Sequence, residues 1–300
     1  MNIKLGINTN FALNRFPNPE DWIPLVADEF GLKYVQFTAD ILNPSLPDNI
    51  INDHLKRINR LTNKYNVFIE HTFTGSFTRV NHLSHPDPNI RDFWFNWFLK
   101  FVDISVALGA KNMGSHLGIL SIPDLHDPEI RKQRLHDGIE YWHKIAEYAK
   151  QKGLSYLTWE PMSVAREYGE TILETKRINN LLNNNSPLPF KLCLDVDHGD
   201  VSSNNPDDTN PYTWLKELGN QAPIIHIKQS TTNKGGHWPF TGEYNKNGKI
   251  IPEKIIKTLK EANIQETSLL LELSFREREP FDSMVIKACR ESASFWKPYL

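Results

Sequence analysis

Eight short apolar runs alternate with eight longer segments of helical period along this 300-residue chain. Each run has the length of a β-strand, and each longer segment places its apolar residues on one face of a helix. Such alternation is typical of parallel βαβ units, and eight units that close on themselves form a (β/α)₈ TIM barrel of about 250 residues. The chain is therefore predicted to be a single-domain TIM barrel over residues 1–300.

The predicted strands are 4–8, 34–38, 67–71, 112–116, 156–160, 191–195, 224–228 and 268–273. The predicted helices are 20–29, 49–64, 89–108, 129–151, 170–183, 211–219, 252–262 and 281–295. Gly31, Gly109 and Gly153 stand just before the next strand, as glycines at helix C-caps do. An open doubly wound sheet shows the same alternation, but no glycine-rich phosphate motif follows the first strand here.

Composition excludes several classes of protein. A net charge of -2 gives no overall attraction to nucleic acid or anionic membranes. No apolar segment approaches a membrane span, and the N-terminus lacks the pattern of a signal peptide, so we expect a cytoplasmic protein without membrane or nucleic-acid partners. Cys193 and Cys289 are expected to be reduced, packed thiols, since neither has a CxxC partner.

Side chains that bind metals stand at the ends of six predicted strands: His71, His116, Glu160, Asp195, His226 and Glu272. The carboxyl ends of the strands form the active site in this fold, so these groups should meet at one rim. A single histidine or glutamate at a strand end is more often a structural, hydrogen-bonded group. Six of them at one rim predict an enzyme with a divalent metal.

The ligand types indicate which metal. Three carboxylates and one imidazole form a hard, oxygen-rich set that suits Mn²⁺ or Mg²⁺, while Co²⁺ or Zn²⁺ remain compatible through the nitrogen. Glu160 and Glu272 follow core-like sequences, and a shared cation would satisfy both buried charges. Asp197 is the alternative to Asp195. We favour Asp195, because His198 follows it at a spacing that can return a second side chain to the same site.

The chain resembles the xylose isomerase-like TIM barrels, a sugar phosphate isomerase/epimerase superfamily that includes ketose 3-epimerases and barrel-type apurinic endonucleases. The resemblance rests on Trp159-Glu160-Pro161, Leu194-Asp195-Val196-Asp197-His198, His226-Ile227-Lys228 and Leu271-Glu272-Leu273-Ser274-Phe275. It implies that one divalent metal, Mn²⁺ first, is held by Glu160, Asp195, His226 and Glu272. The same two glutamates would form the catalytic acid/base pair.

The implied reaction is proton transfer at the carbon next to a ketose carbonyl, through an enediolate. The sequence leaves open whether the outcome is epimerisation or aldose–ketose isomerisation. The residues expected to bind the substrate are His71, His116, Arg166, His198, Lys228 and His237. The alternative for Lys228 is a solvated lysine at a strand end.

Two long loops favour a phosphorylated substrate. The tagatose-type epimerases usually have an arginine shortly after the strand 7 histidine, whereas this chain has Gln229-Ser230-Thr231-Thr232. The same loop continues with Lys234, Gly235 and Gly236, and the loop after strand 3 offers Thr72, Thr74, Gly75, Ser76 and Arg79. Glycine-rich loops with basic and hydroxyl side chains can bind phosphate. The best match is a small ketose phosphate of the erythrulose type.

The alternative function is an apurinic endonuclease-type zinc phosphodiesterase. The order of its ligands resembles that of His71, His116, Glu160, Asp195, His198, His226, His237 and Glu272. Gly235 stands where that site needs an aspartate, and the chain lacks the basic surface that binds a phosphate backbone.

The aromatic-rich segment 93–98 predicts either core packing or the interface of a homodimer.

Overall fold

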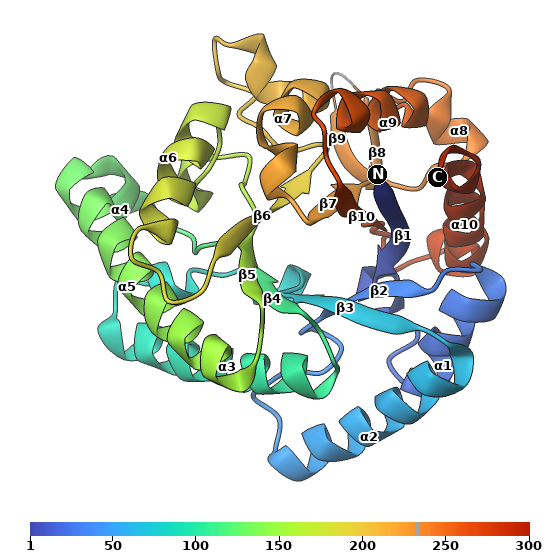
Figure 1. The fold of residues 1–300 in the computed structure, drawn as a ribbon, viewed down its shortest axis with the longest axis horizontal. Helices are drawn as coiled ribbons and strands as arrows, with labels where there is room; N and C mark the ends of the chain where they lie inside the picture. Colours follow the sequence, from blue (N-terminus) through green and yellow to red (C-terminus); the bar gives the residue numbers. More distant parts are fainter. Residues whose placement is uncertain (232–233) are drawn as a thin grey trace.

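The computed structural model describes residues 1–231 and 234–300. Eight parallel strands close into a barrel in the order β1-β10-β7-β6-β5-β4-β3-β2, and the helices surround it (Figure 1). The barrel strands are β1 (Asn2–Asn8), β2 (Tyr34–Thr38), β3 (Phe68–Phe73), β4 (Asn112–Ser115), β5 (Tyr156–Trp159), β6 (Phe190–Asp195), β7 (Ile224–Ile227) and β10 (Glu266–Leu271). The predicted TIM-barrel fold is confirmed.

All the predicted helical segments are present, and the first of them divides into α1 and a π-helical turn, η2. They are α1 (Pro19–Pro24), η2 (Leu25–Glu29), α2 (Asp48–Tyr65), α3 (Pro88–Ala107), α5 (Pro128–Lys152), α6 (Ile172–Asn183), α7 (Pro211–Leu218), α9 (Pro252–Glu261) and α10 (Phe281–Trp296). Short helices α4 (Ile122–His126) and α8 (Gly242–Asn245) add to these. Gly31, Gly109 and Gly153 have positive φ angles of 58°, 77° and 96°, which confirms the predicted caps.

Two of the differences from the predicted strand ends concern the site. Strand β3 continues to Phe73, so His71 lies two residues before its end. The long loop after β7 contains an antiparallel hairpin of β8 (Gln229–Thr231) and β9 (Lys234–Trp238). Residues 232 and 233, including Thr232, lie outside the described residues, as does the side chain of Lys234.

The aromatic segment of α3 packs mainly into the core. Trp97 and Phe98 are buried, whereas Phe93 is 55% exposed. Core packing therefore accounts for most of this segment, and the homodimer stays a prediction.

Cys193 and Cys289 are buried and free, as expected. Within the described residues, no helix combines the length and apolar character needed to cross a bilayer.

Candidate active site

A cavity of about 620 Å³ opens at the carboxyl ends of the barrel strands. Its lining includes most of the predicted site residues: His116, Glu160, Arg166, His198, His237 and Glu272. Active sites in this fold occur at this end of the barrel, because the βα loops there carry the variable side chains. The cavity is therefore the candidate active site.

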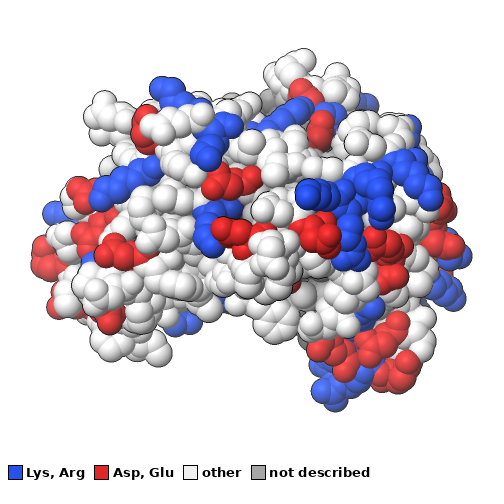
Figure 2. All heavy atoms as spheres, turned by 90° about the horizontal axis from the view of Figure 1, so that it is seen from below, with Lys and Arg blue, Asp and Glu red and all other residues white. Residues whose placement is uncertain are grey.

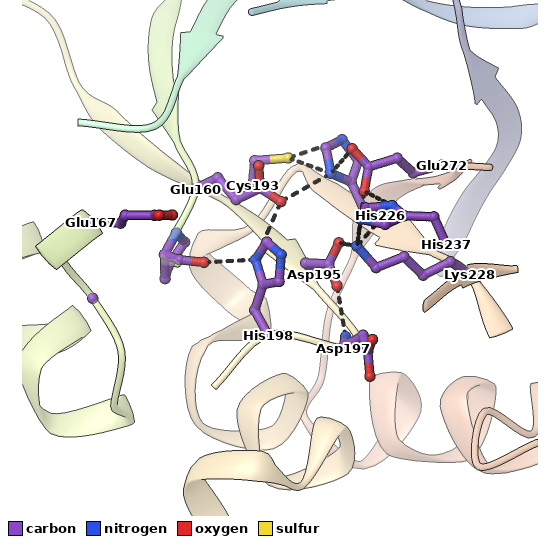
Figure 3. Close-up of polar contacts among 12 residues, drawn as sticks. Glu160, Glu167, Cys193, Asp195, Asp197, His198, His226, Lys228, His237 and Glu272 are labelled. Atoms are coloured by element: carbon purple, nitrogen blue, oxygen red, sulfur yellow. Dashed lines mark hydrogen bonds and ion pairs between the residues drawn. The ribbon is translucent and has the colours of Figure 1, made fainter. Parts of the chain in front are cut away.

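Four side chains from adjacent strands converge at the base of this cavity (Figure 3). Glu160 follows β5, Asp195 ends β6, His226 lies in β7 and Glu272 follows β10. One possible ligand atom from each lies within 4.8 Å of the others. Parallel pairing places Asp195 level with His226, so that neighbouring strands present these groups at the same height.

The imidazole of His226 is oriented from both sides. Its Nε2 lies 2.7 Å from Gln36 Oε1, and its Nδ1 lies 3.2 Å from Glu160 Oε1 and 3.5 Å from Glu272 Oε1. Burial opposes a charge on this ring, but the adjacent Cys193 sulfur and the charges of Glu272 and Glu160 raise its pKa well above the usual value. A nitrogen that faces two carboxylates requires a proton or a metal ion between them. Metal-binding histidines have the same arrangement, with the second nitrogen hydrogen-bonded.

Lys228 is buried beneath the same carboxylates. Its Nζ lies 2.6 Å from Asp195 Oδ2 and 3.1 Å from Glu272 Oε2, so the alternative of a solvated lysine is wrong. Burial disfavours the ammonium, yet the charges of Asp195 and Glu272 raise the pKa of Lys228. With His226 neutral, as a metal-binding imidazole must be, three carboxylates and one ammonium leave two negative charges uncompensated. This charge and the donor set fit a divalent cation.

The sequence profile of the xylose isomerase-like TIM barrels matches residues 25–298. The chain belongs to this family. D-erythrulose 1-phosphate 3-epimerase of Brucella abortus is 40% identical over 301 residues, which cover 100% of this chain and 97% of that protein. This relationship makes the chain an isomerase-class enzyme.

Solved structures of the family share the fold. A xylose isomerase candidate from Rhodospirillum rubrum superposes with a TM-score of 0.90 at 24% identity and covers 99% of each chain. D-allulose 3-epimerase from Methylomonas sp. superposes with a TM-score of 0.71 at 17% identity, covering 100% of this chain and 98% of that one. At these identities the likeness concerns the barrel and not the substrate.

Two histidines flank the four-residue cluster of this family member. His198 Nδ1 donates to the carbonyl oxygen of Pro161 at 3.0 Å and lies 3.6 Å from Glu160 Oε1. His237 Nδ1 lies 3.3 Å from Glu272 Oε2. Burial raises the pKa of Glu272, but His226, Lys228 and His237 together hold it well below its usual value.

Asp197 does not join the cluster. Its carboxylate accepts the Gly236 N–H at 3.0 Å and pairs with Lys249 at 2.7 Å. The structure thus places Asp195, and not Asp197, with Glu160, His226 and Glu272, while the role of Asp195 as a metal ligand stays a prediction. Because Asp197 takes up the Gly236 N–H, this amide of the β9 hairpin is not offered to a phosphate.

The loop after β3 places Thr74, Gly75, Ser76 and Arg79 in the cavity lining, but two of its predicted phosphate-binding groups bond within the protein. Thr72 lies in β3, where its hydroxyl contacts Ser105 Oγ at 2.6 Å, and the Gly75 N–H donates to Thr78 Oγ1 at 2.7 Å. Neither group offers a hydrogen bond to a phosphate. Arg79 does line the cavity, where its guanidinium pairs with the buried carboxylate of Glu167, a residue of η5 (Ala165–Glu167) that the sequence did not single out.

His71 does not reach the cavity. Its Nδ1 lies 2.7 Å from Asn112 Oδ1 and its Nε2 lies 3.1 Å from Ser268 Oγ, within the barrel. Burial lowers the pKa of His71 to about 4. The longer β3 strand is the physical reason, since it places His71 two residues below the rim. The expected contact of His71 with substrate is thus not supported by the geometry.

Proposed function

We propose that this chain is a divalent-metal-dependent 3-epimerase of a small ketose phosphate, with D-erythrulose 1-phosphate as the first candidate. The observation that carries the proposal is the convergence of Glu160, Asp195, His226 and Glu272 within 4.8 Å at the base of the cavity. The full-length likeness to an enzyme named for this substrate supports the choice.

The metal would be held by the three carboxylates and the His226 imidazole. Mn²⁺ suits this set best, and Mg²⁺, Co²⁺ or Zn²⁺ are compatible with it. When bound, a divalent ion polarises the ketose carbonyl and the adjacent hydroxyl. Gln36 would fix the ring of His226 for this purpose, since it holds the other ring nitrogen.

Glu160 and Glu272 would carry out the proton transfer. They follow β5 and β10, which are separated in the barrel by β6 and β7, so the two carboxylates approach a substrate from different sides. One glutamate removes the proton from the carbon next to the carbonyl, and the other returns a proton on the opposite face of the resulting enediolate. His198 and His237 lie beside these glutamates and would bind substrate hydroxyls.

Arg166 and Arg79 would bind the phosphate. Both line the cavity, and no lysine lines it within the described part of the chain. Arg166 has no carboxylate within ion-pair distance among the described residues, and its Nη1 lies 3.4 Å from the Leu120 carbonyl. A guanidinium has five donors, so Arg79 keeps donors for a phosphate while it pairs with Glu167. We do not assign this role to Lys228, because its ammonium already contacts Asp195 and Glu272.

A test follows from the chemistry of the substrate. Erythrulose 1-phosphate has its carbonyl at C2 and a single stereocentre at C3, so a 3-epimerase converts it to its mirror image. Optical rotation should therefore decay to zero, while the proton spectrum in H₂O remains that of one ketose phosphate. In D₂O the C3–H signal should disappear during turnover. An aldose–ketose isomerase would instead produce aldehyde or hydrate signals, and no exchange at C3 with active-site metal present would contradict the proposal.

No specific observation favours the nuclease alternative. His71, the first of its expected ligands, is hydrogen-bonded inside the barrel, away from the cluster. Lys and Arg are interspersed with Asp and Glu over the face drawn in Figure 2. Metal analysis of protein purified without chelator should give about one divalent ion per chain, whereas about three zinc ions would favour the nuclease. The expected cytoplasmic location and the absence of nucleic-acid partners stay predictions.

A further inference from the structure

A second pair of histidines lies beside the cavity. His82 belongs to the short turn η4 (His82–Ser84), and His116 directly follows β4. The two rings are stacked, with centroids 4.3 Å apart and planes 26° apart, and His82 Nε2 lies 3.1 Å from His116 Nδ1. Both residues are buried, and His116 lines the cavity.

The hydrogen bonds determine which ring nitrogens carry protons. The backbone N–H of Leu83 donates to His82 Nδ1 at 2.7 Å, so this nitrogen is an acceptor. The proton of His82 therefore resides on Nε2, which donates to His116 Nδ1. His116 in turn carries its proton on Nε2. This last nitrogen is buried and has no hydrogen-bond partner among the described residues.

Aromatic side chains pack around the ring of His82 in the described structure. Trp94, Phe98 and Trp142 surround the ring, with centroids 6.1, 5.3 and 6.3 Å away. The aromatic-rich segment of α3 therefore packs against the His82 ring. The backbone of His82 is also strained, with a φ of +31°, and such strain commonly marks functional positions.

We propose that His82 is a positioning residue that holds His116 as the neutral Nε2–H tautomer, so that His116 donates a hydrogen bond to a substrate oxygen that gains negative charge. The identity of that oxygen, on the carbonyl or the enediolate, rests on the proposed function. Burial and the nearby charge of Arg79 lower the pKa of His116 to about 3, which agrees with a neutral ring. A neutral imidazole can stabilise a developing oxyanion without transferring its own proton.

The tautomer can be measured without any activity. Nitrogen-15 NMR of histidine-labelled, Mg²⁺-loaded protein should show His116 protonated at Nε2 only. His82→Phe keeps an aromatic ring but removes the donor, so His116 should lose this single tautomer. His82→Gln retains a donor and should preserve it. An imidazolium or an Nδ1–H tautomer at His116 in the unaltered protein would overturn the proposal, whether or not the variants fold.

Kinetics then separate positioning from a purely structural role. His82→Phe should lower kcat about 10- to 100-fold, with a smaller change in KM, because one transition-state hydrogen bond is weakened. His116→Gln replaces the ring by an amide whose donor does not depend on residue 82. Adding His82→Phe to His116→Gln should therefore cause no further loss, whereas additive losses would show that His82 acts independently of His116. If no ketose phosphate is turned over, the proposed function fails, and the tautomer measurement still decides this inference.

Discussion

The ammonium of Lys228 lies 2.6 Å from Asp195 Oδ2, and the two side chains are 1% and 0% exposed. An ion pair buried this deeply depends on mutual compensation, because each charge has lost its hydration. Lys228 also contacts Glu272, so one ammonium partly neutralises two of the four proposed metal ligands. Lys228 thus reduces the negative charge of the three carboxylates to an amount that one divalent cation balances.

Replacement of this lysine should destabilise the metal-free protein more than the metal-loaded protein. Lys228→Met leaves Asp195 and Glu272 uncompensated, which should cost about 3 to 5 kcal/mol of unfolding free energy in the presence of a chelator. A bound divalent ion would compensate the same carboxylates and reduce the loss. Lys249→Met, at the less buried pair with Asp197, is the control in urea denaturation. Equal losses with and without metal would contradict this view of the cluster.

The two glutamates should be indispensable for proton transfer. Glu160→Gln and Glu272→Gln should each lower kcat about 100- to 10,000-fold, even where metal is retained, since an amide cannot accept the proton. Deuterium incorporation at C3 and the metal content of each variant are the two measurements. Glu174→Gln, in the first turn of α6, should leave both unchanged. Full exchange in either active-site variant would rule that glutamate out as acid or base.

Arg166 should affect substrate binding more than chemistry. Arg166→Met removes a guanidinium from the cavity and should raise KM for erythrulose 1-phosphate about 10- to 100-fold with little change in kcat. Its effect on slow turnover of unphosphorylated erythrulose should be much smaller. Arg177→Met, which breaks a surface pair with Glu174, is the matched control. Equal effects on both substrates would place the phosphate elsewhere.

Acid should destabilise the fold through His71. Burial lowers the pKa of His71 from 6.5 to about 4. Between these two pH values the imidazole is protonated in the unfolded chain and neutral in the folded protein. The stability linked to His71 is complete above pH 6.5 and is lost as the pH falls towards 4, a difference of about 3 kcal/mol. His71→Gln should flatten the pH dependence of urea denaturation in this range. His136→Gln, on the exposed surface of α5, should not, and an unchanged slope for His71→Gln would refute the assignment.

Local sequence patterns were sufficient for the barrel and for the main cluster. Short apolar runs predicted the eight strands and segments of period 3.6 predicted the helices between them, because buried strands are apolar throughout and a helix buries one face. Parallel strands end at a common rim, so strand-end residues such as Glu160, Asp195 and His226 could be placed together without coordinates. The resemblance to a known family then suggested the roles that are proposed for them.

Tertiary structure decided the relationships that depend on residues distant in sequence. His71 lies below the rim because β3 extends two residues farther than its apolar run suggested. Lys228 turns inward because carboxylates from β6 and β10 compensate its charge there. His82 carries no strand-end signal, and only the packing of α3 and α5 around its turn brings it against His116. The chain's periodicity thus determines where strands end, whereas burial and charge compensation between elements determine which polar groups face the substrate and which support them.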